Sequence, residues 1–403
     1  NIKIFCFDKL HMELLRILAD SVLNAIKNVL YRAETYKKIF GAELLRKIDK
    51  LGVSNSNVNQ CILERLKEFY NILKIEIEDI AEIDEIYKKV SKVVSDIANI
   101  LGLQSCLKIM ANVGAAFEPL LGTDVRYREH FVHQFQVFLL GYYIINKEKT
   151  FQDMLIKFLS EIGGSDRRVE DVLKVWFITS MFHDVSYSVE KMESWLKRYF
   201  ERVAMPPKIQ VGWADLFTHY EAEKINLVEL IFGRGIGKRK DEIANIIKNA
   251  FIEEHDHGVI GGLSLLKILH SEIDYELLKV ACCAILLHTE NVYSKFGRIS
   301  IGQFPFAFLL VFCDNVQQWG RPRIMSLIPE IMVKLKDIIM SSPFKEVKIK
   351  LEYQKLTSEQ KRIVEGNFIP ATMHWCSDAT MFSVELYEEE RDAFRCFSHN
   401  SEC

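Results

Sequence analysis

The sequence predicts a mostly α-helical protein with a small α+β region near its C-terminal end. Two observations support this prediction. Only 8 of the 403 residues are proline and 19 are glycine, which favours long helices over a turn-rich β architecture. Apolar residues recur every three or four positions over most of the chain, and they alternate with polar residues only in the last part.

Residues 1–115 form the first predicted region, an N-terminal helical extension. The stretch 62–101 carries Ile and Leu at intervals of three and four among Lys and Glu, which is typical of amphipathic helices. The polar segment GVSNSNVNQ at 52–60 predicts a loop. We expect these helices to have one solvated face and one packing face, without chemistry of their own.

Residues 116–340 form the second predicted region, which is also helical but richer in apolar and aromatic residues. Within it, residues 201–245 have the pattern of an insertion with a loop at each end. The two loop sequences are VAMPPKIQVGW and FGRGIGKRK. We expect the functional site in this region, because most histidines that lie near acids fall here.

Residues 341–403 form a small α+β region in which the periodicity changes. Residues 347–353 alternate between apolar and charged side chains, and FSVELY at 382–387 alternates likewise, so both segments predict half-buried strands. Between them, Thr357 and Gln360 fit a capping box and predict a short helix.

The overall composition argues against several classes of partner. A net charge of −3 provides no general attraction to nucleic acid or to an anionic membrane. The longest apolar stretch, 304–313, is too short to span a bilayer, and the N-terminal residues lack the layout of a secretory signal. The nine cysteines include no C-x-x-C pair. We therefore expect reduced thiols and a cytoplasmic location.

Three apolar segments end in residues that can bind a metal. FITSMF is followed by His183 and Asp184, VACCAILL by His288, and FAFLLVFC by Asp314. An ionised carboxylate at a buried helix end is costly unless something compensates its charge. A bound cation shared by the three segments would do so, and imidazole and carboxylate donors suit zinc, iron, manganese and similar metals.

Two further segments offer histidine ligands. YREHFVHQFQ has His130 and His133 three residues apart on one face of a predicted helix. EEHDHGVIGG holds His255, Asp256 and His257 just before a pair of glycines. The residues alone leave both choices open, between His130 and His133 and between His255 and His257.

Taken in order, these segments resemble the HD-domain superfamily of metal-dependent phosphohydrolases over residues 130–322. FHDV resembles the family's His-Asp signature, and HGVIGG resembles the His-x-x-x-Gly-small segment of members with two-metal sites. CDNVQQWGRP resembles the closing Asp segment. The six residues that match the family's metal ligands are His133, His183, Asp184, His257, His288 and Asp314.

The resemblance implies an HD-type helical core that binds two divalent transition metal ions, drawn from Fe, Mn, Co, Ni and Zn. A first ion would be held by His133, His183, Asp184 and Asp314. A second would be held by His257 and His288, with Asp184 bridging the two. Such a pair can polarise a phosphoryl oxygen and lower the pKa of a bound water.

Three residues are candidates for catalytic roles. Asp184 would help to activate water, Tyr187 could donate a proton or stack on a base, and Arg321 could meet a substrate phosphate or pair with an acid. Tyr187 stands where the cyclic-dinucleotide branch of the family has lysine, and no Gly-Tyr-Pro follows His288. Both departures argue against cyclic di-GMP as the substrate.

The leading hypothesis is a metal-dependent phosphohydrolase or phosphodiesterase that acts on a nucleotide or another small phosphorylated molecule. One alternative is an HD-fold diiron oxygenase, because the same order of six ligands also resembles those enzymes. Another is a protein that senses a nucleotide without turning it over. We expect no membrane or nucleic-acid partner, and a homo-oligomer is compatible with the sequence.

Overall fold

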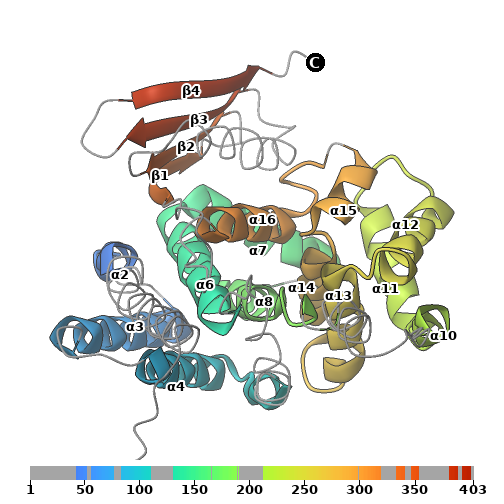
Figure 1. Ribbon diagram of the computed structural model, residues 1–403, viewed down its shortest axis with the longest axis horizontal. Helices are drawn as coiled ribbons and strands as arrows, with labels where there is room; N and C mark the ends of the chain where they lie inside the picture. The colour runs from blue at the N-terminus through green and yellow to red at the C-terminus, as the bar shows by residue number, and fades with distance from the viewer. Residues whose placement is uncertain are drawn as a thin grey trace, which may run out of the picture.

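The computed structural model describes residues 42–51, 56–76, 83–109, 130–164, 166–187, 189, 212–297, 299–318, 333–340, 346–353, 381–388 and 393–400. The protein is mostly helical, with a small sheet near its C-terminal end, as the sequence predicts (Figure 1). In this part of the chain, no helix combines the length and the apolar character needed to cross a membrane.

The helices fall into three groups, which lie next to one another in Figure 1. The N-terminal group is α2 (Ala42–Asp49), α3 (Asn57–Glu76) and α4 (Ile83–Leu101). The central group is α6 (His130–Lys147), α7 (Lys149–Gly163), α8 (Val169–Phe182), α13 (His257–Leu269), α14 (Tyr275–Leu286) and α16 (Pro305–Gln318). The third group is α10 (Trp213–Thr218), α11 (Glu221–Gly233), α12 (Lys240–Ile252) and α15 (Glu290–Tyr293), which is followed by the short 3-10 helix η1 (Ser294–Phe296).

Helix α8 lies at the centre of the molecule. It contacts α3, α4, α6, α7, α14 and α16, and every residue from Val175 to Phe182 is buried. A helix that is apolar on all sides is stable in water only when other elements surround it. The residues that follow its last turn, His183 and Asp184, are therefore delivered to the interior.

A glycine allows α6 to lie close against α8. A Cβ atom at Gly141 would stand 2.0 Å from the ring of Trp176, so no larger residue fits there without displacing one helix. The indole Nε1 of Trp176 donates to the carbonyl oxygen of Phe138 at 2.9 Å. This close contact fixes the position of α6 relative to the end of α8.

The N-terminal helices are joined to the central group by polar side chains as well as by apolar packing. The Tyr142 hydroxyl donates to Oδ1 of Asn59 at 2.7 Å, and the Ser56 hydroxyl donates to Glu170 of α8 at 2.5 Å. Ser56 also caps α3, because its hydroxyl accepts from the backbone N–H of Asn59 at 3.2 Å. The loop predicted at 52–60 is therefore too long, since residues 57–60 are helical.

The predicted insertion at 201–245 is helical where the structure describes it. Helices α10, α11 and α12 lie at one side of the molecule, and α11 contacts both α13 and α14 (Figure 1). The second predicted loop lies between α11 and α12, where Gly235 and Gly237 have φ values of 72° and 71°. Most of the first predicted loop lies outside the described residues.

The sheet has four strands, β1 (Val333–Met340), β2 (Glu346–Tyr353), β3 (Met381–Glu388) and β4 (Ala393–Asn400), in that spatial order. The outer pairs are antiparallel, and β2 and β3 are parallel. Strands β2 and β3 coincide with the two predicted strands. Strand β1 falls within the range predicted for the helical region, and the helix predicted from Thr357 lies outside the described residues.

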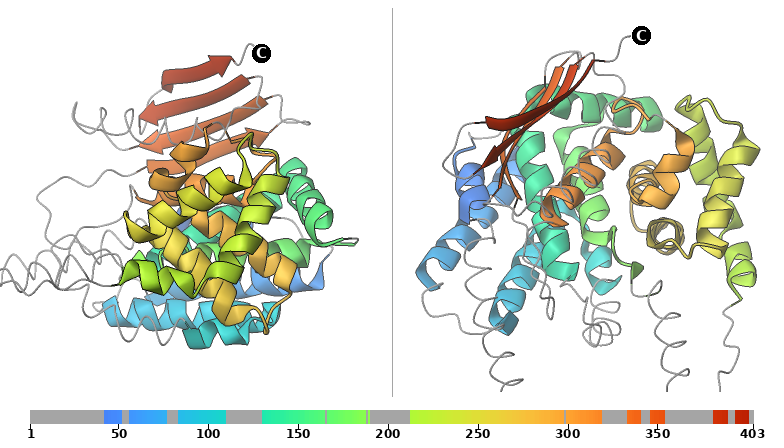
Figure 2. Two further views of the ribbon diagram at one scale, coloured as in Figure 1. Left: turned by 90° about the vertical axis from the view of Figure 1, so that its right-hand side faces the viewer. Right: turned by 45° about the horizontal axis from the view of Figure 1, so that its top comes forward.

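The sheet stands at one end of the helical body, as Figure 2 shows, and β1 contacts α16 and the end of α6. Lys147, the last residue of α6, forms an ion pair with Asp337 and donates to the carbonyl oxygen of Ile338 at 3.1 Å. The Glu148 carboxylate accepts from the backbone N–H of Met340. Charged side chains thus cap the outer edge of β1, which would otherwise be open to another strand.

The start of α14 offers a test of the fold, because Asp274 has two roles there. Its carboxylate accepts from the backbone N–H groups of Glu276 and Leu277 at 3.0 and 3.3 Å, and it pairs with Arg167 at 2.8 Å. Partial burial by itself would raise the pKa of this carboxyl, but the bonds from Arg167 and from the two N–H groups hold the pKa below its ordinary value.

We expect Asp274→Ala to lower the free energy of unfolding by about 1 kcal/mol at neutral pH, because the helix loses its cap. Asp274→Asn keeps a capping side chain and should cost less. Since the folded-state pKa is depressed, the stabilisation by the charge is complete above about pH 4, the unfolded value, and is lost as the pH falls through the folded value. Urea unfolding curves recorded at progressively lower pH should therefore show the free energies of unfolding of the wild type and Asp274→Asn converging. A gap that stays constant down to about pH 3 would contradict this account.

Candidate metal centre

Five segments deliver side chains to one place in the interior. His133 lies in the first turns of α6, and Asp314 lies in α16. His183 and Asp184 follow α8, His257 opens α13, and His288 follows α14 by two residues. Two groups of these residues could each hold a metal ion, with the ligand atoms of each group within 4.8 Å of one another. The groups are His133, His183 and Asp184, and Asp184, His257 and His288.

The first group is largely buried, and a second carboxylate, that of Asp314, lies beside it. His133 Nε2 stands 2.8 Å from Oδ1 of Asp314. His183 Nε2 stands 3.4 Å from Oδ2 of Asp184 and 3.6 Å from Oδ1 of Asp314. The side chains of His133 and His183 are 1% and 0% exposed, and those of Asp184 and Asp314 only 10% and 13%, so solvent compensates the two carboxylates poorly at this point.

The second group is more open and shares Asp184 with the first. His257 Nε2 stands 3.5 Å from Oδ1 of Asp184 and 3.2 Å from Nε2 of His288. Asp184 therefore turns one oxygen toward His183 and the other toward His257. A carboxylate in this position can bridge two cations.

Hydrogen bonds set which ring nitrogen of two histidines faces the cluster. Nδ1 of His183 donates to the Ser180 carbonyl oxygen at 2.8 Å, and Nδ1 of His288 donates to that of Ile285 at 2.6 Å. In the neutral form of each ring the proton then lies on Nδ1 and the lone pair on Nε2, as metal ligation requires. His270 makes the same bond at the protein surface. The bond from Nδ1 to a backbone carbonyl is therefore not specific to the metal centre. His183 and His288 differ from His270 in that their Nε2 atoms point toward other candidate ligands.

The side chains present fit a metal ion. Nε2 of His183 is buried without a hydrogen-bond partner, although it faces two carboxylates. A buried polar atom in that state is costly, and a cation between the imidazole and the carboxylates would satisfy all of them. Imidazole and carboxylate donors together suit first-row transition metals. These His and Asp side chains could therefore bind metal.

The pKa values follow from burial and from the neighbouring charges. Burial lowers the pKa of His183, but Asp184 and Asp314 raise it more, so the pKa stands well above its ordinary value. Burial lowers the pKa of His288 to about 4, and the nearby His257 and His183 contribute to this shift. His288 is therefore neutral at physiological pH, the form that binds metal.

Two glycines of α13 bring His257 close to His288. A Cβ atom at Gly258 would stand 2.7 Å from the carbonyl oxygen of Ile285, and one at Gly262 would stand 2.7 Å from that of Cys282. The backbones of α13 and α14 are thus in direct contact on this side. The spacing of four residues between the glycines puts both on one helix face, and it is the sequence signal for this contact.

The structure bears on the alternatives that the sequence leaves open. The His255 ring stacks on Trp213 and belongs to neither ligand group, whereas His257 belongs to the second. His133 belongs to the first group, and the side chain of His130 lies outside the described residues.

The three predicted catalytic residues have different outcomes. Asp184 belongs to both ligand groups. Tyr187 is partly buried and meets the ring of His257 edge to face, with ring centroids 5.6 Å apart. Arg321 lies outside the described residues.

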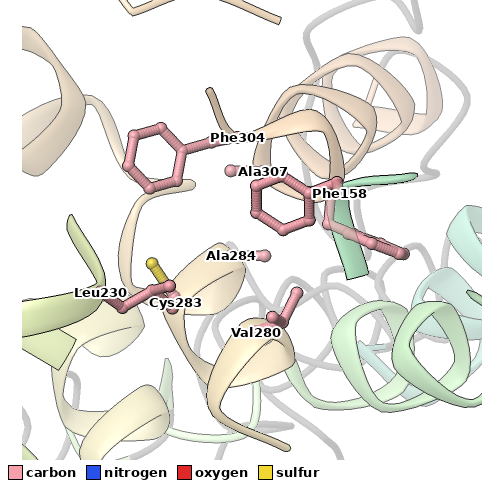
Figure 3. Close-up of a pocket in the computed structure, with 8 residues that line it drawn as sticks. Phe158, Leu230, Val280, Cys283, Ala284, Phe304 and Ala307 are labelled. Carbon is pink, nitrogen blue, oxygen red and sulfur yellow. The ribbon is translucent and has the colours of Figure 1, made fainter. Parts of the chain in front are cut away.

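A small pocket between α7, α11, α14 and α16 has a different character (Figure 3). Its lining is entirely apolar apart from the thiol of Cys283, whose pKa is raised by burial. The enclosed space of about 10 Å³ is close to the room that one water molecule needs. It offers neither the charge nor the volume for a substrate.

Comparisons with protein-family models, with curated proteins and with solved structures found no match. The resemblance to HD-domain proteins therefore stays a prediction from the order of the motifs.

The close approach of α13 to α14 predicts a specific sensitivity at Gly258. We expect Gly258→Ala to lower the free energy of unfolding by about 1–3 kcal/mol, because its Cβ would collide with backbone and force the helices apart. Gly261→Ala is the matched control in the same helix, since its nearest neighbour would stand at an ordinary 3.4 Å. Urea unfolding should show little change or a small gain for the control. Equal losses for the two variants would contradict the proposed contact.

Proposed function

We propose that this protein is a metal-dependent phosphohydrolase or phosphodiesterase of the HD type that acts on a nucleotide or another small phosphorylated molecule. The observation that carries the proposal is the pair of ligand groups that share the Asp184 carboxylate. A bridged pair of cations suits phosphoryl transfer, because it can stabilise both the attacking and the leaving oxygen. The order of the six residues along the chain supports the same assignment.

The protein's own side chains have separable roles in this proposal. His133, His183, Asp184 and Asp314 hold one divalent transition metal ion, and Asp184, His257 and His288 hold another. When bound, the ions would polarise a phosphoryl oxygen and lower the pKa of a bound water. Asp184 would help to activate that water. The Tyr187 ring lies against His257, where its hydroxyl can assist the leaving oxygen.

The donor set also favours one alternative, a diiron oxygenase. The two groups offer four imidazoles and the shared Asp184 carboxylate, and Asp314 beside His133 adds a second carboxylate. Such nitrogen-rich sites bind iron as readily as they bind hydrolytic metals. Iron in the purified protein together with substrate-dependent consumption of dioxygen would favour this alternative, and hydrolysis with redox-inert metals would exclude it.

Elemental analysis of protein purified without chelator tests the centre. We expect about two metal equivalents in the wild type, and a sharp fall in Asp184→Ala, because that residue serves both groups. His288→Ala should lose about one equivalent. His270→Ala is the matched control, since it removes a histidine with the same carbonyl bond at the surface. Retention of both ions by Asp184→Ala, or no metal in the wild type, would refute the centre.

Hydrolysis assays test the reaction class. The protein loaded with Mn, Fe, Co or Ni should cleave a p-nitrophenyl phosphate ester or a member of a nucleotide panel. Loss of either carboxylate, by Asp184→Asn or Asp314→Asn, should lower kcat/KM by at least about 100-fold. A fully loaded wild-type protein that cleaves none of these compounds would contradict the proposal.

A further inference from the structure

The loop between α12 and α13 holds one residue in an unusual conformation. His255 has a φ of 51°, in the left-handed region, and Asp166 is the only other non-glycine residue with positive φ in the described ranges. Residues other than glycine adopt this conformation at an energetic cost, and they keep it only where the surroundings enforce it. His255 stands two residues before His257, which belongs to the second ligand group.

The surroundings that enforce the conformation are aromatic. The His255 ring stacks on the indole of Trp213, with centroids 4.4 Å apart and planes inclined by 23°. Trp213 is only 6% exposed and packs edge to face against Phe251 of α12, with centroids 5.9 Å apart. The indole is therefore also held by Phe251 of α12, and it offers a fixed surface to the imidazole.

The next residue, Asp256, is held by hydrogen bonds. Its backbone N–H donates to the carbonyl oxygen of Ala250 at 2.9 Å, and its carboxylate caps α13 by accepting from the N–H of Val259 at 3.0 Å. Asp256 thus anchors the chain on both α12 and α13 immediately before His257, and the His255 ring contacts α10 through Trp213. His257 itself is 18% exposed, the most open of the three side chains in its group.

We infer that the stack of His255 on Trp213 is a positioning device for the metal ligand His257. The stack holds residue 255 in the left-handed conformation, and this directs Nε2 of His257 toward Asp184 and His288. His255 sets the metal affinity of the second group without binding metal. The inference rests on the proposed metal centre. It assigns a role to His255, which the sequence alone left as an alternative ligand to His257.

Metal titration of His255 variants tests the inference. His255→Asn keeps a residue that tolerates the left-handed conformation but removes the ring. His255→Phe keeps an aromatic ring that can stack on Trp213 but has no nitrogen to bind metal. Each apo-protein is titrated with Co²⁺, and binding is followed by calorimetry and by the visible absorption of the bound ion. The wild type should show two steps, one for each ligand group.

We expect His255→Asn to keep the first step and to weaken the second by about 10- to 100-fold, the range for residues that orient a metal ligand. His255→Phe should restore the second step to within about threefold of the wild type. Trp213→Leu should weaken the second step as His255→Asn does, and the double variant should show no further loss, because both changes remove one contact. Retention of the first step in the same samples reports that the variants are folded.

Three outcomes would overturn the inference, and they separate it from the proposed function. Unchanged second steps in all variants would remove the positioning role while leaving the metal centre intact. Failure of His255→Phe to rescue would show that the nitrogens of His255 matter, as expected of a ligand. A wild type that binds no Co²⁺ would refute the proposed centre and the inference together.

Discussion

The buried carboxylate of Asp184 is the constraint on which the rest of the site depends. It follows α8, whose second half is entirely buried, and its two oxygens face different histidines. Only 10% of the Asp184 side chain is exposed, so a charge in this position must be compensated mainly by groups within a few ångströms. Helices α6, α13, α14 and α16 are almost entirely apolar where they meet this point, and each contributes one polar group to it. The apolar residues along these helices thus form the core, and a single polar residue from each contributes to the candidate metal centre.

Much of this arrangement could be predicted from the sequence, because burial leaves a clear pattern. An apolar run such as VACCAILL must be surrounded by protein, so the polar residue after it must find partners there. Alternation likewise predicted β2 and β3. Strands β1 and β4 were not predicted in this way, although each pairs with the strand next to it in the sequence. In β1 the register irregularity between Leu335 and Asp337 interrupts the alternation. The choice between His255 and His257 depends on the backbone conformation of one residue, for which EEHDH carries no local signal.

The regions on either side of the central helices are integrated with them by polar contacts. Asn59 of α3 bonds to Tyr142 of α6, and Lys147 at the end of the same helix bonds to the first strand of the sheet. Helix α6 therefore contacts the N-terminal helices, the sheet and, through His133, the candidate metal centre. These specific bonds define the orientation of α6, whereas apolar packing alone would tolerate rotation about its axis.

The glycine contact between α13 and α14 has a consequence for how this protein can vary. At Gly258 and Gly262 the two helices meet through main-chain atoms, which are the same in every amino acid. The separation of the His257 and His288 rings is therefore insulated from the volumes of the surrounding aliphatic side chains. Those aliphatic residues can be substituted in the course of evolution without changing the distance between the two imidazoles, provided that the two glycines are retained.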